Sequence, residues 1–121
     1  MPQVEVVRSD TVAPEVLQPI LELLPEVVAE SLTCNDPGGQ LSAEDIEVLF
    51  RDGHDYDCGG PPQHPYHLQI RIFANDFPSR RNNLDTRRTV LIENLRSVVP
   101  RDLNVYIWIL LCPGSFGTVW E

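Results

Sequence analysis

Alternation of apolar and polar residues predicts β-strands at residues 3–7, 45–51 and 67–73, and a continuous apolar run predicts a fourth at residues 104–112. The last of these, Asn-Val-Tyr-Ile-Trp-Ile-Leu-Leu-Cys, contains no charged side chain. A strand that is apolar along its whole length is typical of the interior of a sheet. We therefore expect residues 104–112 to form the central strand.

Two longer segments, residues 12–32 and 79–99, repeat their apolar residues at helical spacing. Pro14 suits the first turn of the first helix. Pro19 and Pro25 fall within that helix, on its polar side, where each proline removes a backbone hydrogen bond. We predict one helix that bends away from the core, rather than two separate helices.

The elements follow the order β-α-β twice. Residues 4–10 (Val-Glu-Val-Val-Arg-Ser-Asp) parallel residues 70–76 (Ile-Arg-Ile-Phe-Ala-Asn-Asp), and a helix, a turn with proline and a second strand follow each. A strand–helix–strand crossover makes its two strands parallel. The chain therefore predicts an α+β fold, in which two β-α-β units form one four-stranded mixed sheet with two helices on one face.

We expect residues 1–121 to form a single domain, because a chain of this length suits one core. Unit one would span residues 1–51, a connecting loop 52–65 and unit two 66–121. The sheet face without helices is expected to carry Arg71, Phe73, Tyr106, Trp108 and Leu110. An uncovered face with this much apolar area is typical of an interface, so another subunit should cover it.

The composition argues against several classes of function. The net charge of −9 argues against nucleic-acid binding, which needs a basic face. No run approaches the roughly 20 apolar residues of a membrane-spanning helix, and no signal-peptide pattern opens the chain. The three cysteines lack the spacing of a disulfide framework and are expected to be reduced. These observations favour a cytoplasmic protein that does not bind membranes.

The charges are divided unevenly along the chain. Residues 1–65 hold thirteen of the eighteen acidic residues and two of the nine arginines, and residues 66–121 hold the other seven arginines. A local basic cluster in an acidic protein can attract small anions. We therefore expect small anionic ligands rather than polyanions.

Pro2 directly precedes the first predicted strand. Aminopeptidases generally remove an initiator methionine before a small residue, which would leave a secondary amine at the edge of the sheet. An ordinary α-amino group has a pKa of roughly 7.7–8.0, and burial or a nearby guanidinium lowers it. An amine with a pKa near neutrality is suited to proton transfer. The alternative is that Pro2 is the second residue of an inert terminus.

These residues resemble the tautomerase superfamily, whose members begin with a catalytic proline and are built from β-α-β units. Arg8-Ser9-Asp10 is similar to the Gly-Arg-Ser-Asp of 4-oxalocrotonate tautomerase, whose arginine contacts a substrate carboxylate. Residues 42–48, followed by Tyr56 and a glycine pair at 59–60, resemble the family's second strand, pocket aromatic and glycines. The departures are a shorter first strand and Glu47, which stands where the family has a second arginine. Within this superfamily, which includes 4-oxalocrotonate tautomerase and macrophage migration inhibitory factor-like proteins, the two-unit chain looks more like the fused members. These include the isomerases of carboxymethyl-hydroxymuconate type and the cis-3-chloroacrylate dehalogenases.

The resemblance implies a cofactor-independent tautomerase or isomerase, or a related dehalogenase or decarboxylase. Pro2 would move a proton between carbon and oxygen of a small anionic carbonyl compound or unsaturated acid. Fused members are trimers, so a homotrimer is implied. The alternative function is a non-catalytic oligomeric binding protein of the same fold, in which Pro2 is inert.

The resemblance also implies two groups of substrate-binding residues. Arginines would bind the substrate carboxylate through paired hydrogen bonds; the candidates are Arg8, Arg80 and Arg81. Aromatic residues would exclude water and lower the pKa of the amine; the candidates are Tyr56, Phe73 and Trp108.

A second cluster of chemically capable residues lies in the predicted loop. His54, Cys58, His64 and His67 are of types that bind metals, but they lack a tight pair such as Cys-x₂-Cys. We therefore expect a polar loop and no metal or other cofactor.

Overall fold

The computed structural model describes residues 2–8, 12–52, 67–113 and 119–120. Its elements, in chain order, are β1 (Gln3–Arg8), α1 (Pro14–Leu32), the 3₁₀ turn η1 (Ala43–Asp45), β2 (Glu47–Asp52), β3 (Leu68–Asn75), α2 (Pro78–Asn82), α3 (Leu84–Leu95) and β4 (Val105–Cys112). None of the described helices combines the length and hydrophobicity that a membrane crossing needs.

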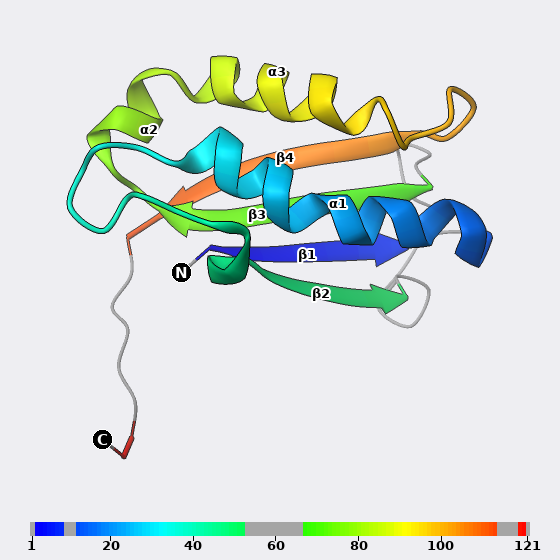
Figure 1. The fold of residues 1–121 in the computed structure, drawn as a ribbon, viewed down its shortest axis with the longest axis horizontal. Helices are drawn as coiled ribbons and strands as arrows, with labels where there is room; N and C mark the ends of the chain where they lie inside the picture. The colour runs from blue at the N-terminus through cyan, green and yellow to red at the C-terminus, as the bar shows by residue number, and fades with distance from the viewer. Residues whose placement is uncertain (1, 9–11, 53–66, 114–118, 121) are drawn as a thin grey trace, which may run out of the picture.

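The four strands form one mixed sheet in the order β2-β1-β3-β4. β1 and β2 are parallel, β3 and β4 are parallel, and the two units join through the antiparallel pair β1 and β3. Helices α1 and α3 lie on the same face of the sheet (Figure 1). The predicted α+β fold of two β-α-β units is confirmed.

The expectation that residues 104–112 form the central strand is wrong, because β4 is an edge strand. Its apolar character has two separate sources. Ile107 and Ile109 turn towards the helices and pack against the core, whereas Tyr106 and Trp108 are exposed on the other face. A strand with apolar residues on both of its faces can therefore be an edge strand of the sheet.

α1 is a single helix that contains both Pro19 and Pro25, as predicted. Pro19 is exposed and lies away from the buried stripe, whereas Pro25 is half-buried, so the expectation that it lies on the polar side is not met. The buried stripe repeats at intervals of three and four residues and consists of Leu17, Ile20, Leu24, Val27, Val28 and Leu32. Burial of this stripe against the sheet maintains the helix despite the lost hydrogen bonds.

The second predicted helix, residues 79–99, is divided in the structure. α2 ends at Asn82 and α3 begins at Leu84, because Asn83 has a non-helical backbone (φ −135°, ψ 37°). Asparagine side chains compete for backbone hydrogen bonds and favour helix ends. α3 ends at Leu95, and turns follow as far as Val99.

The core lies between the sheet and the two long helices. Inward-facing residues of the two central strands, Val4, Val6, Ile70 and Ile72, are completely buried. They belong to one cluster with apolar residues of α1 and α3, including Leu24 and Leu91. Buried apolar area of this kind is the main source of folding free energy.

The opposite face of the sheet carries the residues predicted for it. The register aligns Leu49, Glu5, Arg71 and Trp108 in one row across the four strands. Phe73 pairs with Leu110 in the next row, and Gln69 pairs with Tyr106. We call the surface formed by these outward-facing strand residues, from Gln3 on β1 to Leu110 on β4, the bare face.

Candidate functional site

Pro2 is buried at one end of the sheet. Its carbonyl oxygen accepts a hydrogen bond from the Glu47 backbone N–H at 3.3 Å, at the start of β2. Because the next residue, Gln3, pairs with Phe73 near the end of β3, the turn from β3 into α2 reaches the same end. We call this end of the sheet the Pro2 edge; β1 and β2 begin there, and β3 and β4 finish there.

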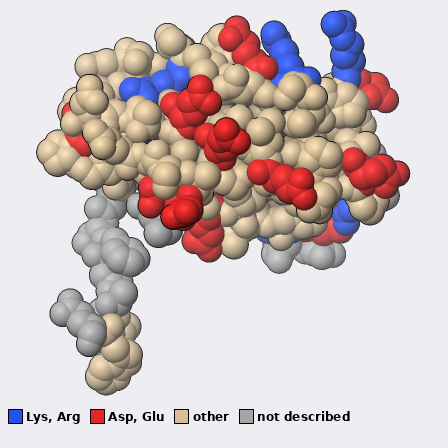
Figure 2. Space-filling view, viewed as in Figure 1, with Lys and Arg blue, Asp and Glu red and all other residues tan. Residues whose placement is uncertain are grey.

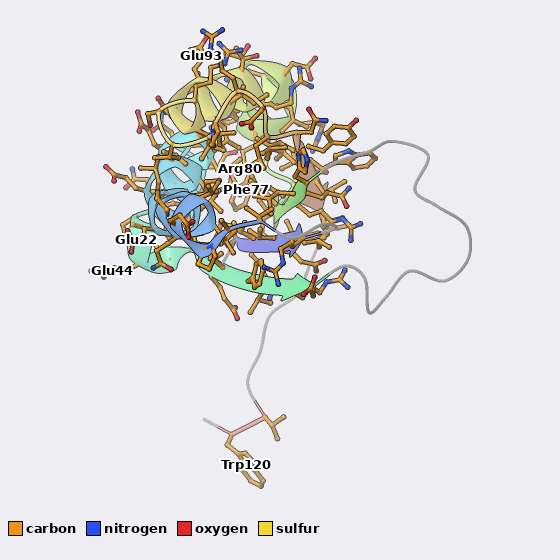
Figure 3. All side chains as sticks on the ribbon, turned by 90° about the vertical axis from the view of Figure 1, so that its right-hand side faces the viewer. Glu22, Glu44, Phe77, Arg80, Glu93 and Trp120 are labelled. Atoms are coloured by element: carbon orange, nitrogen blue, oxygen red, sulfur yellow. The ribbon has the colours of Figure 1, made fainter. Side chains whose placement is uncertain are left out.

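Arg80 is buried close to the Pro2 edge, where three backbone carbonyls surround its guanidinium. Nε donates to the Leu32 oxygen at 2.8 Å, Nη1 to the Asn75 oxygen at 3.2 Å and Nη2 to the Gly39 oxygen at 3.4 Å. The guanidinium also lies 4.8 Å from the ring centre of Phe77 (Figure 3). Arg80 thus connects the end of α1, the turn after it and the end of β3.

Burial lowers the pKa of Arg80 from its ordinary value, and the nearby Cys34 and Asp36 partly oppose this shift. The donors of Arg80 already serve carbonyl groups, so a substrate carboxylate would have to displace one of these contacts. The geometry places Arg80 as a support beneath the Pro2 edge.

Arg81, the next residue, has a different environment. Its side chain is 60% exposed, and Nε donates to Asp76 Oδ1 at 2.9 Å. Both residues follow the end of β3, and therefore lie towards the Pro2 edge. Of the two arginines predicted in this region, Arg81 is the one that an incoming anion can reach.

Arg8 lies at the opposite end of β1. Its Nη2 contacts Asp52 Oδ2 at 2.8 Å, and its guanidinium lies 5.4 Å from the ring centre of Phe50. The hydrogen bond to Asp52 raises the pKa of Arg8. A strand advances about 3.3 Å per residue, so Arg8 is roughly 20 Å from Pro2 along the strand. One small ligand cannot contact both residues of the same chain.

The predicted aromatic residues are not gathered in one place. Tyr56 lies outside the described residues. Phe73 is half-buried on the bare face and pairs with Gln3, so it lies next to the Pro2 edge. Trp108 is 57% exposed and pairs with Arg71, one row further from that edge.

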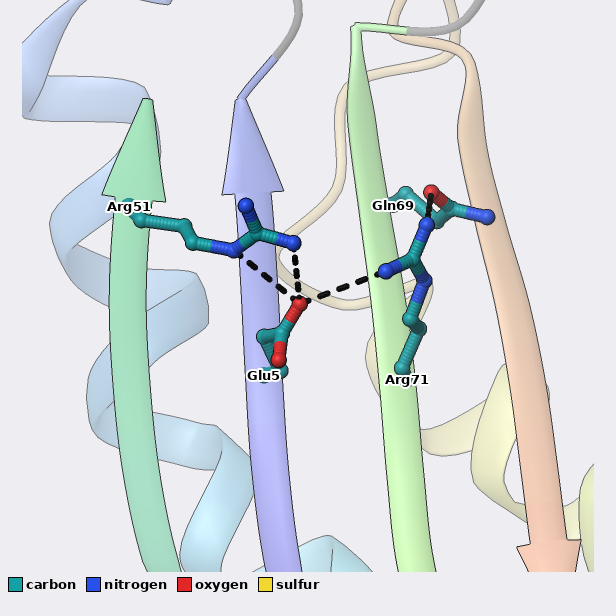
Figure 4. A network of polar contacts seen from close by, with 4 residues as sticks. All are labelled: Glu5, Arg51, Gln69 and Arg71. Atoms are coloured by element: carbon teal, nitrogen blue, oxygen red, sulfur yellow. Dashed lines mark hydrogen bonds and ion pairs between the residues drawn. The ribbon is translucent and has the colours of Figure 1, made fainter. Parts of the chain in front are cut away.

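The structure also shows a polar network that the sequence did not reveal (Figure 4). Glu5 Oε1 accepts hydrogen bonds from Arg51 Nε and Nη2, at 3.1 and 2.7 Å, and from Arg71 Nη1 at 3.3 Å. Arg71 Nη2 donates to Gln69 Oε1 at 2.9 Å. The network lies in the middle of the bare face. The sequence could have indicated this network only through the alternation of each strand, which places all of these residues on the outward face.

The described residues contain no group of three potential metal ligands. His54, Cys58 and His64 lie outside the described residues. The Nδ1 atom of His67 accepts a hydrogen bond from the Asn104 backbone N–H at 2.9 Å, which links the starts of β3 and β4. This contact gives His67 a structural role.

The chain matches no protein-family model and no curated protein sequence. It does match solved structures over nearly its whole length. FG41 malonate semialdehyde decarboxylase inhibited by 3-bromopropiolate is 15% identical, with a TM-score of 0.61, and the match covers 97% of this chain and 90% of that one. Native fused 4-OT is 15% identical, with a TM-score of 0.60 and coverages of 98% and 94%.

A macrophage migration inhibitory factor-like protein from Entamoeba histolytica is 12% identical, with a TM-score of 0.56 and coverages of 93% and 90%. Over these spans the present chain shares its overall fold with these structures. The chain therefore has the fold of the tautomerase superfamily, which confirms at the level of fold the resemblance seen in its sequence.

Proposed function

We propose that this protein is a cofactor-independent tautomerase or isomerase, with Pro2 as its general base. The observation that carries the proposal is the position of Pro2, at the start of β1 and at the end of the sheet where α2 follows β3 and carries Arg81. The solved structures of the same fold include named enzymes, among them malonate semialdehyde decarboxylase.

Removal of Met1 would turn the buried Pro2 nitrogen into a secondary amine. In the proposed ketonisation of an enol acid, this amine takes the enol hydroxyl proton, and the resulting ammonium gives a proton to the neighbouring carbon. Arg81 holds the substrate carboxylate by hydrogen bonds. Phe73, beside the Pro2 edge, supplies an apolar wall that disfavours the charged amine and lowers its pKa.

The other predicted residues enter the proposal through assembly. Arg8 is roughly 20 Å along β1 from the Pro2 of its own chain. In this proposal, Arg8 therefore contacts a substrate that is bound at the Pro2 of a neighbouring copy. Tyr56 and Trp108 remain candidates for the same shared pocket, and Arg80 supports it from beneath. We propose a cytoplasmic homotrimer; solved fused 4-OT structures are described as trimers.

The test begins with the intact mass of the purified protein, which should correspond to a chain without Met1. Phenylenolpyruvate ketonisation is then measured for the parent protein, Pro2→Ala and the neighbouring control Gln3→Ala. Pro2→Ala should lower kcat/KM by about 100-fold or more, the usual contribution of a general base, whereas Gln3→Ala should stay near the parent. Retention of Met1, or full activity of Pro2→Ala, would refute the mechanism.

A second candidate is a non-catalytic oligomeric binding protein of the same fold. The saturated contacts favour it: Arg80 serves three carbonyls, and Arg8 is paired with Asp52. Under this reading Arg81 would bind an anion without chemistry. Anion binding that persists in Pro2→Ala, in a parent protein without ketonisation activity, would favour this candidate.

A further inference from the structure

The two sides of the Pro2 edge differ in charge. On the β3 side, the short helix α2 carries the two arginines described above. On the β2 side, η1 and the first residue of β2 carry three acidic residues within four positions, Glu44, Asp45 and Glu47. The strand order is β2-β1-β3, so Pro2, at the start of β1, lies between these two sides. Figure 2 shows acidic side chains over η1 and α1, and basic side chains mainly over α2 and α3.

Glu47 is fixed next to Pro2 by the backbone. Its N–H donates to the Pro2 carbonyl oxygen at 3.3 Å, and its strand partner is Gln3, the residue that follows Pro2. Paired strands lie about 4.8 Å apart, so the Glu47 carboxylate is within reach of a small molecule bound at Pro2. Residues that are partners across a sheet point to the same face. Glu47 therefore shares the bare face with Phe73, the partner of Gln3 on its other side.

The acidic residues around the Pro2 edge differ in how far they are already engaged. Asp45 accepts hydrogen bonds from the Ser42 N–H at 2.8 Å and the Ser42 hydroxyl at 3.3 Å, which cap η1. Glu44 and Glu47 are exposed, and within the part of the chain that the structure describes neither forms an ion pair. The β2 side therefore keeps negative charge that no arginine neutralises.

This difference in charge determines how a ligand can lie across Pro2. A ligand whose carboxylate is bound by Arg81, and whose reacting carbon lies at Pro2, directs its other end towards Glu47. An uncharged or positively charged group is accommodated there. A second carboxylate would be about 6 Å from a like charge, in a site that is partly shielded from water. At an intermediate dielectric constant, such a contact weakens binding by about tenfold.

We propose that Glu47 restricts the ligands of the Pro2 edge to monocarboxylates whose far end is uncharged or positively charged, and excludes dicarboxylates. The inference rests on the proposed function, because it concerns the same site. It goes beyond that function by naming the class of substrate and the residue that selects it.

A pair of substrates that differ by one carboxylate tests the inference. Phenylenolpyruvate and its para-carboxy derivative have the same frame, and the measured quantity is the ratio of their kcat/KM values. The parent should prefer phenylenolpyruvate by about tenfold or more. Glu47→Gln removes the charge with little change of shape and should reduce this preference to about threefold or less. Glu47→Arg should reverse the preference, because a guanidinium binds the second carboxylate.

The controls are Glu93→Gln and Glu93→Arg, which make the same changes in net charge on α3. Figure 3 shows Glu93 on the opposite side of the molecule from Glu44. Both controls should keep the ratio of the parent. An unchanged ratio in Glu47→Gln, a parent that prefers the dicarboxylate, or an equal change in the Glu93 variants would each overturn the inference. If Glu47→Arg fails to fold by circular dichroism, the ratio in Glu47→Gln decides alone.

Direct binding separates this inference from the catalytic proposal. Isothermal titration calorimetry with phenylacetate and 4-carboxyphenylacetate needs no turnover and should show the same preference, in the parent and in Pro2→Ala. Binding that discriminates through Glu47, in a parent without ketonisation activity, would support the ligand class and refute the catalytic function. Ketonisation that depends on Pro2, with neither ratio responding to Glu47, would overturn the inference alone.

Discussion

Two neighbouring arginines at the Pro2 edge have opposite environments. Arg80 is almost completely buried and donates to three carbonyl oxygens, whereas Arg81 is exposed and meets one carboxylate. Successive residues of a helix point about 100° apart, which is enough to turn one guanidinium inwards and the next outwards. At the scale of single residues, the function of an arginine here depends on this rotation.

Replacement of these arginines by lysine should therefore affect stability very differently. Lysine cannot reproduce three divergent hydrogen bonds, so Arg80→Lys should lower the free energy of unfolding by about 3 kcal/mol. Arg81→Lys should change it by less than about 1 kcal/mol, as expected for an exposed pair. Urea unfolding of both variants measures the difference. Similar midpoints would contradict the supporting role of Arg80.

Adjacent glycines provide a second contrast, in the turn after α1. A Cβ atom at Gly39 would collide with Cys34 Sγ and lie 2.9 Å from the Asp36 oxygen, whereas a Cβ at Gly38 would meet nothing within 4 Å. Gly38 has φ of 78°, however, which L-residues rarely adopt.

Gly39→Ala should cost about 2–3 kcal/mol through overpacking, and Gly38→Ala about 1 kcal/mol through backbone strain. The double variant Cys34→Ala/Gly39→Ala should recover part of the larger loss, because it removes the sulfur. Thermal unfolding of the three variants measures this, and an equal loss at both glycines would be inconsistent with the described turn.

At the scale of elements, α1 retains two prolines because its buried stripe compensates for them. Pro19 is exposed and interior, whereas Pro14 occupies the first turn, where an N–H has no helical partner. Pro19→Ala restores a donor within the helix and should raise the free energy of unfolding by about 1 kcal/mol, after allowance for the greater freedom of the unfolded chain. Pro14→Ala is the matched control and should give no gain. Chemical denaturation compares the two, and a gain in both would point to an effect outside the helix.

The identity of the elements could be read from the sequence, because periods of two and 3.6 residues record which side of each element is buried. Two details could not be read in this way. The break at Asn83 depends on a single backbone conformation within a continuous apolar pattern. The edge position of β4 depends on pairing between strands. The apolar pattern that includes Ile107 and Trp108 fits a buried central strand and an uncovered edge strand equally well.

The candidate site, like the fold, could be predicted from the sequence only in part. Pro2 was predicted as a candidate from its place before the first strand, and the end of the sheet at which it lies follows from the strand register. The distance between Pro2 and Arg8 could also have been estimated, but only after the two ends of β1 had been assigned to different sides of the sheet. The Glu5 network required the pairing of three strands, since its members are 46 and 66 positions apart in sequence.

At the scale of the whole molecule, an associating protein unfolds at a temperature that depends on its concentration. The parent melting temperature should rise when the protein is concentrated tenfold, because dilution favours dissociation before unfolding. Differential scanning calorimetry at the two concentrations measures this rise. A parent transition that does not move with concentration would show that the folded chain is stable without a partner.

The antiparallel pairing of β1 with β3 also bears on how the polypeptide can be divided. Each half contains its own crossover, and the backbone of the central strand pair joins the halves without requiring a covalent link. Peptides corresponding to residues 1–52 and 67–121, refolded together, should thus recombine into a native-like heterodimer by fragment complementation. Such recombination would mean that noncovalent contacts, among them the pairing of β1 with β3, are sufficient to hold the two halves together.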